Sequence, residues 1–231
     1  MNLKFSLIAI ATLILVGCGG GSDSPVAPSA TLTKIETINQ AKNSFQALGA
    51  LNSLNQTNTS NTKSSKIFSL KTTSTQCDSG TVSLTETATT SVIVANNCTR
   101  GTVFMNGTFS ESTLEDGSSK TEMSNLTVRT GTVELKTNKF VIVEKESEFW
   151  FTVDGDMKVV AKCFSGQYNF ETREKIYDAQ DGSDNVERGV LKLNGVMYTF
   201  DNPYVTIKIG NTERKILQSE LETELTSGCS E

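Results

Sequence analysis

Residues 191–217 read LKLNGVMYTFDNPYVTIKIGNTERKIL, and this stretch carries the pattern that decides the fold class. Apolar residues occupy every second position, as in VTIKI at 205–209. A strand with this period presents one face to a core and the other to water, as antiparallel sheets allow. Asn194-Gly195 and Gly210-Asn211 separate the apolar runs, and both dipeptides accept the positive φ that two-residue hairpins require.

The same alternation recurs upstream, in VELK at 133–136 and EFWFTV at 148–153. Asp154-Gly155 follows the second of these and predicts another tight turn. We therefore expect residues 77–231 to form a mainly β domain, an antiparallel multi-hairpin sheet or sandwich, which is large enough to bury its own core.

Two short motifs suggest an internal duplication. Their order and spacing agree closely, which predicts one β unit used twice, over residues 77–162 and 163–231. The matched stretches are Cys77–Gly80 with Cys163–Gly166, and Arg100–Gly107 with Arg188–Gly195.

The segment before the β domain has a helical period. Apolar residues recur at steps of three and four, which predicts an amphipathic helix over about 33–54, within a segment 31–55. The helix either packs on the domain or binds a partner or a second copy. Residues 56–76 are rich in Ser, Thr, Asn and Gln, which is typical of a polar linker. The stripe is Leu32, Ile35, Ile38, Ala41, Phe45, Leu48 and Leu51.

The start of the chain resembles the export signal of bacterial lipoproteins. Lys4 precedes an almost wholly apolar stretch of twelve residues, Phe5 to Val16, within the roughly 7–15 of a signal-peptide core. Leu15-Val16-Gly17-Cys18 then resembles the lipobox, whose cysteine receives a diacylglycerol before cleavage. The resemblance implies a signal peptide over 1–17, lipid on Cys18 and a tether over 18–30. The alternative is an ordinary secretory signal with a cysteine there by chance.

This resemblance and the charge together predict the location and the partners. Stable anchoring needs two or more acyl chains, as lipoproteins carry. Gly19 follows the cysteine, which favours the outer membrane of a Gram-negative bacterium over inner-membrane retention. Cleavage would remove one charged residue, Lys4, and change the formal charge from −5 to −6. This acidity argues against a nucleic-acid partner, so we expect the membrane to be the partner, with another envelope protein as a second candidate.

The remaining cysteines predict a disulfide framework. Cys77, Cys98, Cys163 and Cys229 are an even set in an exported chain, and no CxxC spacing or histidine suggests metal. Cys77 and Cys98 bracket a Thr-rich hairpin, so we expect them to pair, which leaves Cys163 for Cys229. Three pairings are possible, and a Cys77–Cys163 bond is the main alternative.

The β region also resembles uncharacterised β-rich lipoproteins of Gram-negative bacteria. The shared pattern is Cys-x-x-Gly at Cys77–Gly80, Asn97-Cys98, and an apolar-Asn-Gly turn at Met105-Asn106-Gly107. The resemblance implies a cell-envelope location and no known activity.

The sequence shows no set of residues that is typical of a catalytic site. The absence of histidine excludes a Ser-His-Asp arrangement. The Ser-Lys stretches at 64–66 and 118–120 lie in polar loop sequence. Glu144, Glu146 and Glu148 alternate as on a solvated strand face. A pair of carboxylates that meet only in space stays open.

Two further groups of residues are candidates for binding. Asp178, Asp181, Asp184 and Glu187 surround a Gly turn and could supply oxygen ligands to calcium, although acidic turns are ordinary between strands. Aromatic side chains could line a groove for glycan or peptide, although such residues usually border a core. These are Trp150, Tyr168, Tyr177, Tyr198 and Tyr204.

The sequence thus predicts a membrane-anchored envelope lipoprotein with a non-catalytic structural or binding role. It predicts no catalytic residue and no cofactor beyond the lipid on Cys18. Two alternatives remain: a carrier or sensor that binds a lipid, glycan or peptide in the β domain, and a hydrolase that uses carboxylates. The sequence does not indicate the oligomeric state.

Overall fold

A computed structural model of the chain describes residues 31–53, 77–130, 133–161, 164–180 and 185–221. These residues form a 16-residue α-helix, two short helical turns at 146–148 and 218–221 and one antiparallel sheet, so the predicted mainly β fold class is confirmed. The helix is α1 (Ile38–Ser53). The strands are β1 (Ser79–Glu86), β2 (Thr90–Arg100), β3 (Val103–Thr113), β4 (Ser119–Thr130), β5 (Val133–Lys145), β6 (Trp150–Ala161), β7 (Phe164–Asp178), β8 (Val186–Leu193), β9 (Val196–Asp201), β10 (Tyr204–Ile209) and β11 (Thr212–Leu217).

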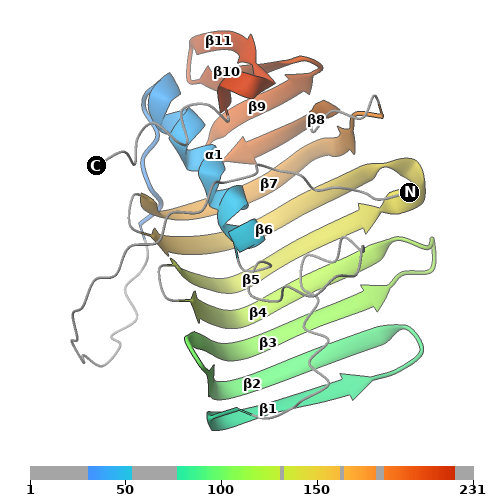
Figure 1. Cartoon of the computed structure of the whole chain (residues 1–231). Helices are drawn as coiled ribbons and strands as arrows, with labels where there is room; N and C mark the ends of the chain where they lie inside the picture. Colours follow the sequence, from blue (N-terminus) through green and yellow to red (C-terminus); the bar gives the residue numbers. More distant parts are fainter. Residues whose placement is uncertain (1–30, 54–76, 131–132, 162–163, 181–184, 222–231) are drawn as a thin grey trace.

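The sheet is a meander in which each strand pairs with its neighbours along the chain (Figure 1). Short turns make this order possible. Asn194 and Gly195 have φ of 48° and 89° between β8 and β9, and Gly210 has φ of 55° between β10 and β11. Both predicted turns are confirmed.

The predicted turn at Asp154-Gly155 is wrong. β6 runs through both residues, and the register between β5 and β6 shifts beside them. Gly155 has φ of +129°, and a Cβ there would lie 2.2 Å from the carbonyl oxygen of Lys139. The glycine therefore permits a close approach of two strands at an irregularity and does not form a turn.

The matched motifs of the predicted duplication lie at different places in the sheet. Gly101 lies in the turn after β2, whereas its match Gly189 lies within β8. Asn106-Gly107 lies inside β3, whereas its match Asn194-Gly195 forms a turn. The motifs share residues that tolerate unusual φ, and the chain uses them for different purposes.

The two faces of the sheet differ in chemistry. The face that carries α1 is lined by buried apolar side chains, and we call it the apolar face. The opposite face carries charged pairs such as Lys120–Glu122 and Lys136–Glu134. Residues of the apolar face include Ile93, Phe109, Met123, Leu135, Phe140, Met157, Tyr168, Leu191, Tyr198 and Ile207.

The helix begins later than the sequence pattern predicted. Thr37 Oγ1 accepts a hydrogen bond from the Gln40 amide, and Gln40 Oε1 accepts one from the Thr37 amide, so a capping box starts α1. Residues 31–36 are not helical, and the Thr33 amide donates to the carbonyl of Gln167 at 2.9 Å. Main-chain pairing with β7 therefore replaces the first predicted helical turn.

α1 packs on the apolar face mainly against β6, β7 and β10 (Figure 1). Ala41, Phe45 and Leu48 of the predicted stripe are buried. The Phe45 ring lies 5.5 Å from the ring of Tyr198, whose hydroxyl donates to the Ala41 carbonyl at 2.7 Å. The predicted stripe therefore faces the domain, as in the first of its two interpretations.

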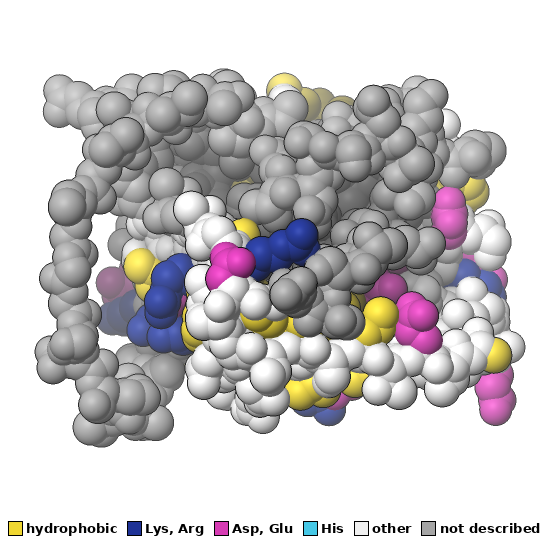
Figure 2. Space-filling view, turned by 60° about the horizontal axis from the view of Figure 1, so that its bottom comes forward, with side chains coloured by type: hydrophobic (Ala, Val, Ile, Leu, Met, Phe, Trp, Pro, Cys, Tyr) yellow, Lys and Arg dark blue, Asp and Glu magenta, His cyan; other side chains and the backbone are white. Residues whose placement is uncertain are grey.

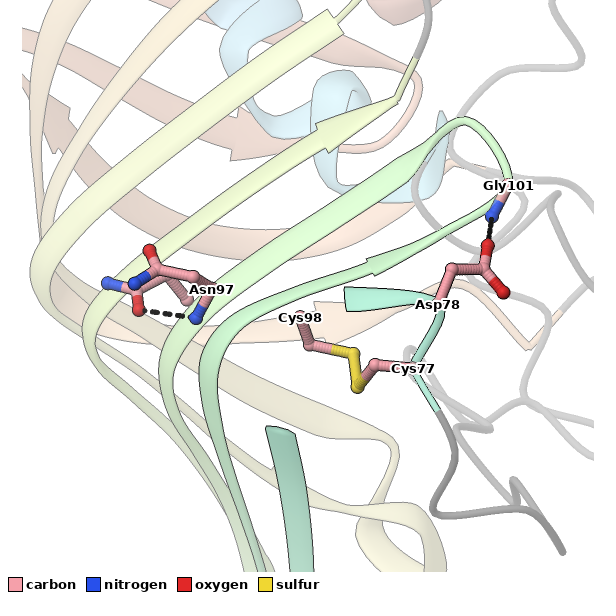
Figure 3. The surroundings of a disulfide bond; sticks show 6 residues. Cys77, Asp78, Asn97, Cys98 and Gly101 are labelled. Atoms are coloured by element: carbon pink, nitrogen blue, oxygen red, sulfur yellow. Dashed lines mark hydrogen bonds between the residues drawn. A yellow bond between two sulfur atoms is a disulfide. The ribbon is translucent and has the colours of Figure 1, made fainter. Parts of the chain in front are cut away.

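A disulfide links Cys77, just before β1, to Cys98 in β2 (Figure 3). The predicted first pair is therefore present. Beside it, the Asp78 carboxylate accepts a hydrogen bond from the Gly101 amide at 2.7 Å. Cys163 and Cys229 lie outside the described residues, so their pairing stays a prediction.

Candidate functional site

A polar pocket of about 520 Å³ lies at one end of β1 to β5. Its volume is within the 300–1,000 Å³ typical of small-ligand sites. Most of the residues that line it carry a hydroxyl or a carboxylate. The lining residues are Glu86, Thr87, Ala88, Thr89, Thr90, Ser91, Glu111, Ser112, Thr113, Ser119, Thr121 and Glu144.

The register of the sheet explains why three carboxylates meet at this pocket. Glu86 of β1 lies opposite Ser91 of β2, and Ser91 lies opposite Glu111 of β3. Glu144 of β5 lies opposite Ser119 at the start of β4. Directly paired residues share a face, so all three acids project from the apolar side of the sheet.

The three acids lie on alternate strands, with hydroxyl residues between them. Adjacent strands are about 4.8 Å apart, so carboxylates two strands apart are separated by about 10 Å at the backbone. Ser119 Oγ donates to Glu144 Oε1 at 3.2 Å, which holds that carboxylate at the pocket wall. The arrangement is a spaced row, which suits an extended ligand better than one small ion.

Burial raises the pKa of Glu144, and the neighbouring carboxylates of Glu111 and Glu146 raise it further. The hydrogen bond from Ser119 acts in the opposite direction but does not reverse the shift. Among the residues that the structure describes, no Lys or Arg forms an ion pair with Glu144. Within the described ranges, the hydroxyl of Ser119 is the group that stabilises its negative charge.

Asp178, at the end of β7, extends the acidic region. Burial raises its pKa to about 6, with a further contribution from the charge of Glu144. Its Oδ2 atom is buried and has no hydrogen-bond partner among the described residues. A carboxyl with this pKa is partly protonated near neutral pH, and the chain contains no histidine that would titrate in the same range.

The predicted solvated face at Glu144, Glu146 and Glu148 is wrong for Glu144. The strand ends at Lys145, and residues Glu146–Glu148 form a 3-10 turn. Glu148 leaves the sheet, pairs with Lys145 at 2.6 Å and accepts a hydrogen bond from the Trp150 indole. Of these three acids, Glu144 is the one that lines the pocket.

The candidate calcium loop is only partly within the described residues. Asp181 and Asp184 lie outside them. Asp178 interacts electrostatically with Glu144, and Glu187 accepts a hydrogen bond from Asn202 Nδ2 at 3.1 Å. Within the described ranges, no group of three Asp, Glu, Cys or His side chains is placed to hold a metal ion.

The other sequence candidates are dispersed. Lys120 of the stretch 118–120 pairs with Glu122 at 2.7 Å, whereas residues 64–66 lie outside the described part of the chain. Tyr168 and Tyr198 are buried in the core, and Tyr204 is 40% exposed on the opposite side of the sheet. Trp150 is buried under Lys175, and Arg188 lies over Tyr177. The aromatic residues therefore do not line one groove.

The predicted lipidation residue, Cys18, also lies outside the described residues. None of the described helices is long and apolar enough to cross a membrane. No protein-family model, curated protein or solved structure matches the chain.

Proposed function

We propose that this protein is a membrane-anchored, non-catalytic binding protein of the cell envelope, and that its pocket binds a ligand with amino groups. The anchoring rests on the lipobox-like Leu15–Cys18 of the sequence. The ligand class rests on one observation: three carboxylates project into a pocket of small-molecule size on a face that is otherwise apolar.

The electrostatics favour a cationic ligand. Ionised carboxylates that are partly removed from water and lie near one another are costly unless a cation joins them. The raised pKa of Glu144 is the sign of this cost in the free protein. An ammonium group beside Glu144 would offset the repulsion that Glu111 exerts on it. The surrounding Ser and Thr hydroxyls can accept the remaining N–H donors.

Isothermal titration with spermidine, glucosamine and glucose tests this function. We expect the amines to bind and glucose not to bind, with an affinity that falls as salt increases. Glu144→Gln and Glu111→Gln should each weaken amine binding about tenfold, since each removes one partly desolvated charge worth about 1.4 kcal/mol. The matched control is Glu134→Gln, which removes an ion-paired carboxylate from the opposite face. Equal binding by Glu144→Gln and by Glu134→Gln would contradict the assignment.

A carboxylate-dependent hydrolase is the second candidate, and a single observation favours it. Asp178, with a pKa of about 6, lies near the ionisable Glu144. A protonated and an ionised carboxyl together are the acid and base of many hydrolases. The screen uses glycoside, ester and peptide substrates, with Asp178→Asn as the control. Turnover that Asp178→Asn abolishes would replace the binding function with this one.

A further inference from the structure

The two edges of the sheet differ in how they are protected. Free edges invite pairing with other strands, and charged residues usually prevent it. β11 carries three consecutive charged residues, Glu213 to Lys215. β1 reads SGTVSLTE, with one charged residue, Glu86, and no lysine or proline. β1 is therefore the edge that is chemically open to another strand.

β1 is also physically accessible. All of its residues except Val82 are exposed, and Val82 is partly buried. Its irregularity is confined to Gly80 at the start, and Thr81 to Glu86 pair regularly with β2. Figure 2 brings this side of the sheet forward and shows mostly backbone and uncharged polar side chains there, with some hydrophobic side chains among them and acidic side chains toward the right-hand end.

We propose that β1 pairs in antiparallel fashion with β1 of a second copy of this chain, with Ser83 on the two-fold axis. In this register the two-fold axis generates two equivalent pairs of Val82 with Leu84 of the other copy, on the apolar face. It also generates two equivalent pairs of Thr81 with Thr85 of the other copy, on the opposite face. Both strands of this pair have the sequence of β1, so a second copy of the chain is a sufficient partner.

Side-chain complementarity selects this register. Leu84 is 37% exposed in one copy, and the pairing covers it with an apolar neighbour. Placing Leu84 on the axis would set Val82 opposite Glu86. Placing Val82 on the axis would set Leu84 opposite Gly80, which has no side chain. A shift by one residue would place the apolar face of one copy beside the polar face of the other.

The pairing extends the fold and also reaches the pocket, because Glu86, a lining residue of the pocket, lies opposite Gly80 of the second copy in this register. A two-fold axis perpendicular to the sheet keeps both apolar faces on the same side. Two meanders then form one continuous sheet, and both exposed edges at β1 disappear. The remaining outer edges are the charged β11 strands.

Disulfide trapping in the full chain tests the register. Opposite residues in an antiparallel pair have Cα atoms about 4.5–5.5 Å apart, which is within the range for a disulfide. Ser83→Cys should therefore form a covalent dimer under mild oxidation, and peptide mapping should show a link between the two thiols introduced at position 83. Thr85→Cys alone should not link to itself, but should link to Thr81→Cys when the two variants are mixed.

A second measurement distinguishes a loss of dimerisation from a loss of folding in the variants. Ser83→Lys sets two positive charges directly opposite each other, so light scattering should show a monomer at concentrations where the Ser83→Thr variant is a dimer. Ser83 is exposed, so at concentrations low enough for the parent to be a monomer both variants should keep the thermal midpoint of the parent. A parent chain that stays monomeric, or cross-linking of Ser83→Cys no greater than that of Glu213→Cys on β11, would overturn the proposal. A self-link at Thr85→Cys would also overturn it.

Discussion

Asp178 should make the stability of this protein depend on pH in an unusual direction. Burial raises its pKa from an ordinary 3.8 to about 6. Well below pH 3.8 the carboxyl is protonated in both the folded and the unfolded chain. As the pH rises from 4 to 6, the unfolded chain ionises this group first. The contribution of Asp178 to stability is therefore present at low pH and is lost as the pH rises through 6.

The magnitude follows from the size of the pKa change. One pH unit of pKa change corresponds to about 1.4 kcal/mol, so the full effect would be about 3 kcal/mol. The side chain is not completely shielded from water, which reduces the expected effect to about 2 kcal/mol. Asp178→Asn removes the ionisation, so this variant should be about 2 kcal/mol more stable than the parent at pH 8. At pH 4 the two proteins should be about equal.

Urea unfolding of both proteins at intervals from pH 4 to pH 8 measures this difference. The comparison cancels carboxylates such as Glu134, whose ion pairs with Lys136 and Arg129 lower its pKa and act in the opposite direction. The chain has no histidine, so few other groups titrate in this window. Asp201→Asn, at a side chain that is 81% exposed, serves as the control. An equal change in stability at pH 4 and at pH 8 for Asp178→Asn would refute this role of the buried carboxyl.

Four other substitutions test the fold and the anchor. Phe45→Ala should lower the free energy of unfolding by about 3–4 kcal/mol, because it leaves a cavity under α1. Tyr198→Phe should cost only about 1 kcal/mol, because it keeps the ring and removes one hydrogen bond; equal losses in chemical denaturation would contradict this packing. Cys77→Ser should cost about 3 kcal/mol through the opened loop to Cys98, measured against the parent under non-reducing conditions. Cys18→Ser, which tests the anchor, should abolish acylation and membrane retention; a variant that is still processed and sediments with membranes would contradict the lipobox assignment.

Local patterns predicted the elements of this fold, because each depends on neighbouring residues. Alternation identified the strands, Asn194-Gly195 a turn, and the stripe through Ala41 and Phe45 the buried side of the helix. Gly155 shows the limit of such patterns. A glycine with positive φ can form a turn or can let two backbones approach, and only the partner strand distinguishes these uses. α1 starts later than predicted for a similar reason, because the main chain near Thr33 forms a hydrogen bond with β7 and does not continue the helix.

The pocket escaped prediction because its residues meet through register. Glu86, Glu111 and Glu144 each follow, by two positions, an apolar residue on the same face of the strand: Leu84, Phe109 and Ile142. A carboxylate in a position that should continue an apolar series is a signal visible in one strand. Taken singly, it is indistinguishable from an ordinary polar strand end. The signal becomes informative when three alternate strands carry a carboxylate near the same end. The folded domain then bears the electrostatic cost of holding these charges close together, and a cationic ligand can offset that cost.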